Sequence, residues 1–344
     1  YTEFIYNSAK VGGAFIIWHN TISHILHCQF SQNNAVLDGG GIHLYKCFTV
    51  TLYQTTFTAD SKPQHGGALS ISDCKNMTIN NGIFKNNAGQ RGGAVSIKDV
   101  ETIFMNGCKF SYNKVKPPVN DEPKYRGGAL FIEGGKHITI NNGLFKNNAA
   151  GKGGAVSIEY IEKVLIEGCI FNHNKATRPG GGGLSVVNVE SVRIYHTDFR
   201  YNFGNNGGSF IIWYISTIIQ IFHCLFSHNN AIYFGGSIHL LKCFTVTISQ
   251  ATFVGNTKPN YGGALFIEGG KNITIKNDLF ISNAGKLGGA VSILDVEAVL
   301  INGCKFNDNK AKRPINKKTK YSGGALFIRG RKEITINNGL FINN

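Results

Sequence analysis

The chain has 344 residues, of which 43 are glycine and only 7 are proline, and 42% of the residues are hydrophobic. Glycine at this level without collagen's every-third spacing, in a chain too hydrophobic to be disordered, predicts regularly spaced tight turns. The formal net charge of +15 favours polyanions such as acidic glycans, or simply a lysine-rich solvated surface. We expect no nucleic-acid partner and, because no apolar run approaches about 18 residues, no membrane span in this fragment.

A Gly-Gly pair, followed by a small residue and an aliphatic one, recurs along the whole chain. The repeats begin at Gly12, Gly39, Gly66, Gly92, Gly127, Gly153, Gly181, Gly207, Gly235, Gly262, Gly288 and Gly323. Most units are 26–28 residues long, whereas those that begin at Gly92 and Gly288 have 35 residues. A fixed period of this length is typical of a solenoid.

Each unit contains two short segments in which apolar residues alternate with variable ones. Ile42-His43-Leu44 follows one glycine pair, and Val50-Thr51-Leu52 follows a few residues later. This alternation predicts short strands with one buried face and an outward-facing middle residue. Strands so short bury that face only when successive coils stack on one another.

A Phe-x-x-Asn marker ends each unit and predicts two columns of like residues at a spacing of about 4.8 Å. The phenylalanine column includes Phe30, Phe57, Phe84, Phe110 and Phe145, and the asparagine column includes Asn33, Asn87, Asn113, Asn148 and Asn174, with Asp60 as its exception. We expect asparagine here because it tolerates the left-handed conformation of a sharp bend and because its amide can bond to the neighbouring coils. The chain is therefore predicted to be all-β, a right-handed parallel β-helix of about twelve coils with two longer ones.

A longer period lies over the coils. Cys47 and Cys243, like Cys108 and Cys304, are 196 residues apart, which is seven coils. The prediction is one continuous β-helix over residues 1–344, with a first module at about 12–206 and a partial second module at 207–344. The two long units carry basic insertions at residues 114–126 and 310–322.

The paired markers Gly-Gly-Ala-(Ile/Leu/Val) and Phe-x-x-Asn resemble those of the chlamydial-type polymorphic outer-membrane proteins. They also resemble the wider set of right-handed β-helix repeat proteins with the pectate-lyase-like fold. The resemblance implies an extracellular or cell-surface location and a passenger region that serves in adhesion.

The ionisable residues do not form a catalytic pattern. Lys75, Glu101, Lys136 and Glu162 occupy one column of successive coils, so their charges alternate as cross-strand pairs. The histidines are scattered, with none at a metal-ligand spacing. We therefore predict no enzyme activity, no catalytic residues, no metal and no cofactor.

Three features remain as candidate sites. Cys47 and Cys74 lie one coil apart in one column and could form a disulfide or remain free thiols. Asn76 and Asn272 begin Asn-x-Thr glycosylation sequons at equivalent positions of the two modules. The second insertion supplies candidate polyanion contacts, unless it is only a solvated loop, through Lys310, Lys312, Arg313, Lys317, Lys318 and Lys320.

These features predict a structural or adhesive scaffold, a segment of a larger repetitive surface protein or filament. We expect self-association, end to end or with neighbouring rods, and contacts with acidic glycans. The alternative is a glycan-binding or polysaccharide-processing domain of the pectate-lyase-like class.

Overall fold

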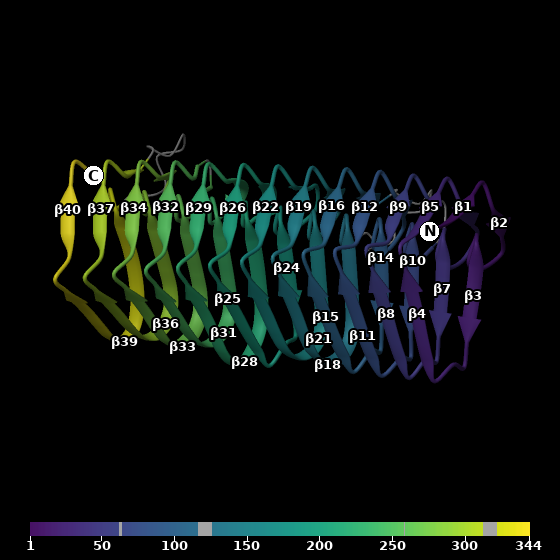
Figure 1. Cartoon of the computed structure of the whole chain (residues 1–344). Helices are drawn as coiled ribbons and strands as arrows, with labels where there is room; N and C mark the ends of the chain where they lie inside the picture. Colours follow the sequence, from purple (N-terminus) through teal and green to yellow (C-terminus); the bar gives the residue numbers. More distant parts are fainter. Residues whose placement is uncertain (62–63, 116–125, 258, 312–321) are drawn as a thin grey trace.

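The computed structural model describes residues 1–61, 64–115, 126–257, 259–311 and 322–344. Within these ranges the chain forms strands and turns but no helix, so none of the described residues belongs to a helix that could cross a membrane. The strands wind into about 11 turns of an all-β parallel solenoid, which confirms the predicted fold class. Figure 1 shows the coils side by side along a rod, with the two ends of the chain at its opposite ends.

Thirteen short strands, each with a marker phenylalanine at its centre or next to it, form one sheet of 13 strands along the rod. They are β1 (Thr2–Ile5), β5 (Cys28–Ser31), β9 (Thr56–Thr58), β12 (Ile83–Lys85), β16 (Lys109–Ser111), β19 (Leu144–Lys146), β22 (Ile170–Asn172), β26 (Asp198–Arg200), β29 (Leu225–Ser227), β32 (Thr252–Val254), β34 (Leu279–Ile281), β37 (Lys305–Asn307) and β40 (Leu340–Ile342).

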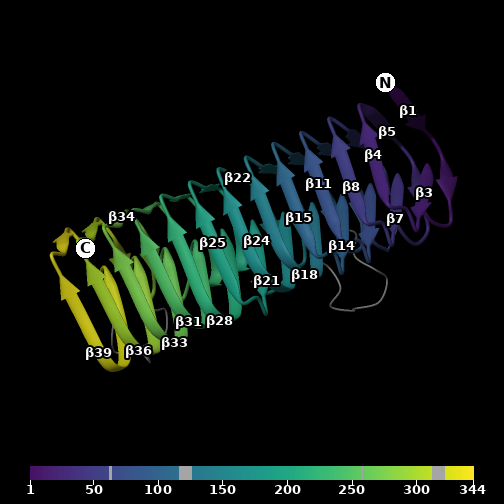
Figure 2. The same cartoon turned by 60° about the horizontal axis from the view of Figure 1, so that its bottom comes forward.

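The two alternating segments of each unit form the other large sheet, which has 17 strands. The first segments are β3 (Phe15–Trp18), β7 (Ile42–Tyr45), β10 (Leu69–Ser72), β14 (Val95–Lys98) and β24 (Leu184–Val187). The second segments are β4 (Ile22–Leu26), β8 (Thr49–Tyr53), β11 (Asn76–Asn80), β15 (Thr102–Asn106) and β25 (Ser191–Tyr195). Both segments join into one bent strand in β18 (Leu130–Asn141), β21 (Val156–Glu167), β28 (Phe210–Phe222), β31 (Ile238–Ser249), β33 (Leu265–Lys276), β36 (Val291–Asn302) and β39 (Leu326–Asn337). Figure 2 shows the bend between them.

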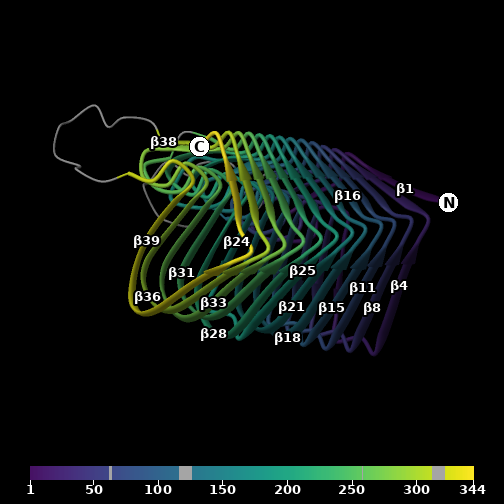
Figure 3. The same cartoon turned by 90° about the vertical axis from the view of Figure 1, so that its left-hand side faces the viewer.

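A third, narrower side of the coil carries very short strands just before the glycine pairs. They are β2 (Ser8–Ala9), β6 (Asn34–Ala35), β13 (Ala88–Gly89), β17 (Lys114–Val115), β20 (Ala149–Ala150), β23 (Lys175–Ala176), β27 (Phe203–Asn206), β30 (Asn230–Phe234), β35 (Ala284–Gly285) and β38 (Lys310–Ala311). Viewed along the rod, successive coils follow nearly the same path (Figure 3).

The coils stack in register, so each sequence position forms a column. Phe84 pairs with Phe57 and with Phe110 through parallel strands. The marker phenylalanines stack with ring centroids 4.6–5.2 Å apart, and the rings of Phe30, Phe57, Phe84, Phe110 and Phe145 are all fully buried. This stack and the aliphatic residues of the large sheet form one core that follows the length of the rod.

The asparagine column is a hydrogen-bonded ladder. The backbone N–H and the side-chain Nδ2 of Asn87 both donate to Oδ1 of Asn113, and Nδ2 also donates to the carbonyl of Phe57. Asn33, Asn113, Asn148 and Asn174 make corresponding bonds.

The conformational reason that the sequence suggested for asparagine is wrong. The left-handed residue at each bend is the one before the ladder position, such as Gln32 (φ 56°) or Tyr112 (φ 58°), and not the ladder asparagine itself. Asparagine is needed at these positions because its amide both donates and accepts along the column.

Candidate functional site

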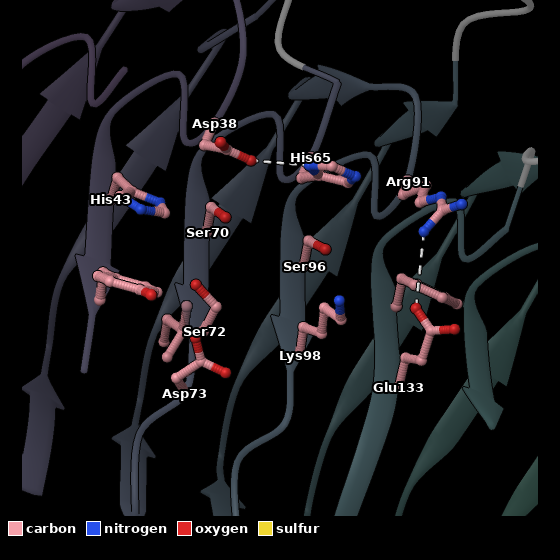
Figure 4. Close-up of a pocket in the computed structure, with 13 residues that line it drawn as sticks. Asp38, His43, His65, Ser70, Ser72, Asp73, Arg91, Ser96, Lys98 and Glu133 are labelled. Carbon is pink, nitrogen blue, oxygen red and sulfur yellow. Dashed lines mark hydrogen bonds and ion pairs between the residues drawn. The ribbon is translucent and has the colours of Figure 1, made fainter. Parts of the chain in front are cut away.

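The glycine pairs create a channel on the outer side of the first strands. Gly66 has a φ of +59°, and a Cβ atom placed there would lie 2.0 Å from the carbonyl oxygen of Leu69. A Cβ on Gly67 would lie 2.0 Å from the carbonyl oxygen of Gly93 in the next coil. No side chain fits at either position, so glycine is what permits the sharp turn of the chain here. The turn places the residue before the pair beside the outer face of the first strand (Figure 4).

This turn corrects one prediction from the alternating pattern. The middle residue of each first strand was expected to face solvent, yet His43 is 9% exposed and Phe131 only 2% exposed. Ser70 and Ser96, in the same column, are each 4% exposed. In β7, β10, β14 and β18 this segment is therefore buried on both faces, against the core on one side and beneath the turn on the other, whereas Ile16 of β3 is exposed.

The channel is hollow where small residues occupy its floor. A groove of about 320 Å³ lies over β7, β10, β14 and the first part of β18, with Ser70 and Ser96 on its floor and Phe131 toward one end. The full lining consists of Asp38, His43, Tyr45, His65, Ser70, Ile71, Ser72, Asp73, Arg91, Ser96, Lys98, Phe131 and Glu133.

Ion pairs hold the polar side chains of the groove. His65 Nδ1 lies 2.7 Å from Asp38 Oδ1, and Arg91 Nη1 lies 3.6 Å from Glu133 Oε2. The Arg91 guanidinium also lies over the ring of Phe131, 5.9 Å from its centroid. Figure 4 shows the Asp38–His65 pair above Ser70 and Ser96, and the Arg91–Glu133 pair to one side of Ser96. The side chains of both pairs are between 26% and 38% exposed, so we assign the pairs an orienting role rather than a large stabilising one.

His43 is a third buried polar residue of the groove, beside Ser70 and Ser96. Its Nδ1 is buried and has no hydrogen-bond partner among the described residues. Burial lowers the pKa of His43, an effect that Asp38 partly opposes and the nearby His65 reinforces. The imidazole is therefore held neutral at physiological pH, and its unpartnered Nδ1 is buried beneath the groove surface.

The groove is suited to binding. Three acidic side chains (Asp38, Asp73 and Glu133) and three basic ones (His65, Arg91 and Lys98) line it together with serine hydroxyls. In the described part of the chain, no cluster of three or more His, Cys, Asp or Glu side chains has the geometry of a metal site.

The cysteine pair singled out from the sequence does lie in adjacent coils. The backbone N–H of Cys47 donates to Sγ of Cys74 at 3.2 Å, but both residues are free thiols. Neither cysteine lies on a strand: Cys47 is in the bend between β7 and β8, and Cys74 is in the bend between β10 and β11. Cys74 Sγ lies 3.3 Å from the carbonyl of Ser72, and burial raises the pKa of the Cys74 thiol to about 12.

The other sequence candidates lie away from the groove lining. Asn76 is half-buried on β11, and Asn272 is exposed on β33. Lys310 is exposed at the start of β38. The remaining candidates for polyanion contact, Lys312, Arg313, Lys317, Lys318 and Lys320, lie outside the described residues.

Sequence reasoning missed the groove. The usable signal was the column directly before the glycine pairs, which contains Asp38, His65 and Arg91 in successive units and Phe234 and Tyr261 in the second module. The importance of that column can be recognised only when the turn is known to place it beside the first strand.

Comparison with known proteins gave two findings. A family model described as a right handed beta helix region matches residues 7–142 and 124–280. A metabotropic glutamate receptor-like protein R from Dictyostelium discoideum is 25% identical over 275 residues, a match that covers 78% of this chain and 15% of the relative. The chain thus spans a small part of that relative's length. No solved structure gives a significant match.

Proposed function

Because the chain belongs to the right-handed β-helix family, we propose that it is a rigid scaffold segment of a longer surface protein, with a structural or adhesive role. The observation that carries this proposal is the unbroken phenylalanine stack from Phe4 to Phe341. The resemblance to polymorphic outer-membrane passengers, the extracellular location, the self-association of rods and the glycans at Asn76 and Asn272 are parts of the same proposal.

A scaffold needs stiffness, and the two columns supply it. Each coil is joined to the next by a stacked ring and by ladder bonds such as those between Asn148 and Asn174. Bending the rod would separate rings and amides on one side, and a buried amide left unpaired costs about 1–3 kcal/mol. Repeat proteins of this kind present long surfaces at fixed spacing.

Electron microscopy of the native protein, together with incubation with acidic polysaccharides, tests this role. We expect straight rods or filaments and no release of shortened sugar products. Release of products would contradict the scaffold role and support the lyase-like alternative.

The surface location has its own test. An endoglycosidase should lower the mass of the native protein, and Asn76→Gln and Asn272→Gln should each remove one glycan. An unchanged mass after treatment would count against a secretory route.

A second candidate function is glycan binding in the groove. The acidic Asp38, Asp73 and Glu133, the basic Arg91 and Lys98 and the serine floor offer donors and acceptors with little net charge. This chemistry fits an uncharged sugar ring better than the polyanion that the overall charge of +15 suggests.

Calorimetric titration with neutral oligosaccharides and their carboxylated counterparts tests that candidate. We expect the neutral sugars to bind, with an affinity that changes little between low and high salt. Binding restricted to the carboxylated sugars, and lost in salt, would instead point to polyanion capture by lysines outside the groove.

A further inference from the structure

Two aspartates are buried inside the rod, away from the groove. Asp60 is 0% exposed and occupies a ladder position that is asparagine in the other coils. Asp278 is 1% exposed, two residues before Phe280, in a column of small residues and cysteines. Acidic side chains are rarely buried without a cation, and each of these has one oxygen, Oδ2, that is buried without a hydrogen-bond partner among the described residues.

At Asp60 the ladder lacks a donor. Oδ1 accepts from the backbone N–H of Asn33 at 2.7 Å and from its Nδ2 at 3.1 Å, and the Asp60 N–H donates to Asn87 Oδ1 at 2.9 Å. Oδ2 stands in for the amide nitrogen of an ordinary rung. The groups that such a nitrogen would contact, Asn87 Oδ1 and the Phe30 carbonyl, are both acceptors. A proton on Oδ2 therefore supplies the missing donor, whereas a carboxylate would face lone pairs.

Asp278 is placed differently but has the same requirement. Its Oδ1 accepts from the backbone N–H of Ala251 at 2.7 Å. The titratable groups that interact with it from neighbouring coils are the thiols of Cys224 and Cys304, whose pKa values burial raises to about 12 and about 11. Neither thiol is a cation, so among the described residues only backbone N–H groups offset a negative charge on Asp278.

We propose that Asp60 and Asp278 make the rod a proton-dependent structure, in which both carboxyls are protonated in mildly acidic surroundings and their ionisation weakens the coils around them. Among the described residues, the groups that hydrogen-bond to the Asp60 side chain or N–H belong to Asn33 and Asn87, and neither is charged. Asp60 lies in the first module and Asp278 in the second, so each module has one position at which ionisation weakens it.

The sign of the pH dependence follows from burial. It raises the pKa of Asp60 to about 7 and that of Asp278 to about 8, from an ordinary value of 3.8 in the unfolded chain. The stability that each protonated acid contributes is fully present below that ordinary value and is lost progressively as the pH rises from there to about 7 for Asp60 and about 8 for Asp278. In that window each acid changes the unfolding constant by up to about tenfold per pH unit.

The duplication provides matched substitutions. The second module has Asn256 where the first has Asp60, and the first has Gly82 where the second has Asp278. Asp60→Asn and Asp278→Gly therefore replace each acid by the residue that the same position already carries in the other module. Both variants are expected to fold.

The test is denaturant unfolding of the whole chain from pH 5 to pH 9, with Asp73→Asn, an exposed position, as the control. In Asp60→Asn and in Asp278→Gly, the unfolding constant should rise with pH less steeply than in the wild-type chain, by up to about tenfold per pH unit. The control should keep the wild-type slope. Slopes equal to that of the wild-type chain would overturn the proposal.

A second measurement does not depend on the variants. Infrared difference spectra of the folded wild-type chain should show a protonated carboxyl band at pH 6 that disappears by pH 9, and the double variant should lack this band. Absence of the band from the wild-type chain at pH 6 would show that both acids are ionised there and would overturn the proposal.

Discussion

The same stretch of the channel is open in the first module and filled in the second. Asp38, His65 and Ser70 line the groove, whereas their equivalents 196 residues later are Phe234, Tyr261 and Phe266. The ring of Phe266 lies 5.3 Å from that of Phe234 and 5.1 Å from that of Tyr261, and it is 1% exposed. Three substitutions in two columns therefore turn a polar groove into a packed aromatic cluster.

Both stretches have a histidine at the same position, and its pKa depends on its neighbours. His239, the equivalent of His43, packs 5.0 Å from the Phe266 ring, and both its ring nitrogens are buried without a partner in the described chain. Burial alone lowers the pKa of His239 to about 3, so it acts as a neutral packing residue. His43 lies near Asp38, which pulls its pKa the other way. The core determines the stacking of the coils, and the residues beside the glycine turns determine whether a stretch of the channel is open or filled.

The largest expected effect tests whether the two modules have equivalent cores. Phe84 and Phe280 are 196 residues apart, both fully buried, with stacked neighbours at 4.6–5.0 Å and 4.7 Å. Phe84→Ala and Phe280→Ala should each lower the free energy of unfolding by about 3–5 kcal/mol, because each leaves a cavity in the stack. Denaturant titration measures both. Clearly unequal losses would mean that the cores differ as well as the channels.

An intermediate effect is expected from exchanging the two channel states. Phe266→Ser should cost about 2–4 kcal/mol, less than a core phenylalanine because water can enter the space that it leaves. Ser70→Phe should close the groove with little loss of stability and should abolish the binding of neutral sugars. Calorimetry and unfolding measured on both variants check this. Sugar binding that survives Ser70→Phe would place the ligand elsewhere.

The fold could be predicted because a fixed period shows directly which residues share a column. Phe57 and Phe84 stack, and Asn87 and Asn113 bond, because a coil cannot shift against its neighbour without disrupting every column at once. The period does not show the path of the backbone at the turns. It therefore gave the wrong surroundings for Ser70 and Phe131 and the wrong conformational reason for the ladder asparagines.

The groove and the thiols show a second limit of sequence reasoning. Sharing a column places Cys47 beside Cys74, but it does not determine whether the two side chains bond, and both are free thiols. Asp38 and His65 also share a column, and their contact depends on rotamers at a turn rather than on period. Column membership thus predicts neighbours, whereas bonding and burial depend on side-chain direction.

The smallest expected effect concerns the Lys–Glu pairs between adjacent coils, the charged rungs, which occur at equivalent positions in the two modules. Lys136 Nζ bonds to Glu101, and Lys332 Nζ bonds to Glu297 Oε2 at 3.0 Å, both on the exposed face. The ammonium of Lys136 lowers the pKa of Glu101, with a smaller contribution from Lys75. Lys136→Gln should therefore raise the pKa of Glu101 toward its ordinary value in an NMR titration, and Lys332→Gln should leave it unchanged. Because the pair is solvent-screened, neither variant should measurably shift the unfolding midpoint. A loss of stability comparable to that of Phe84→Ala would mean that the rungs, rather than the stacked rings, hold the coils together.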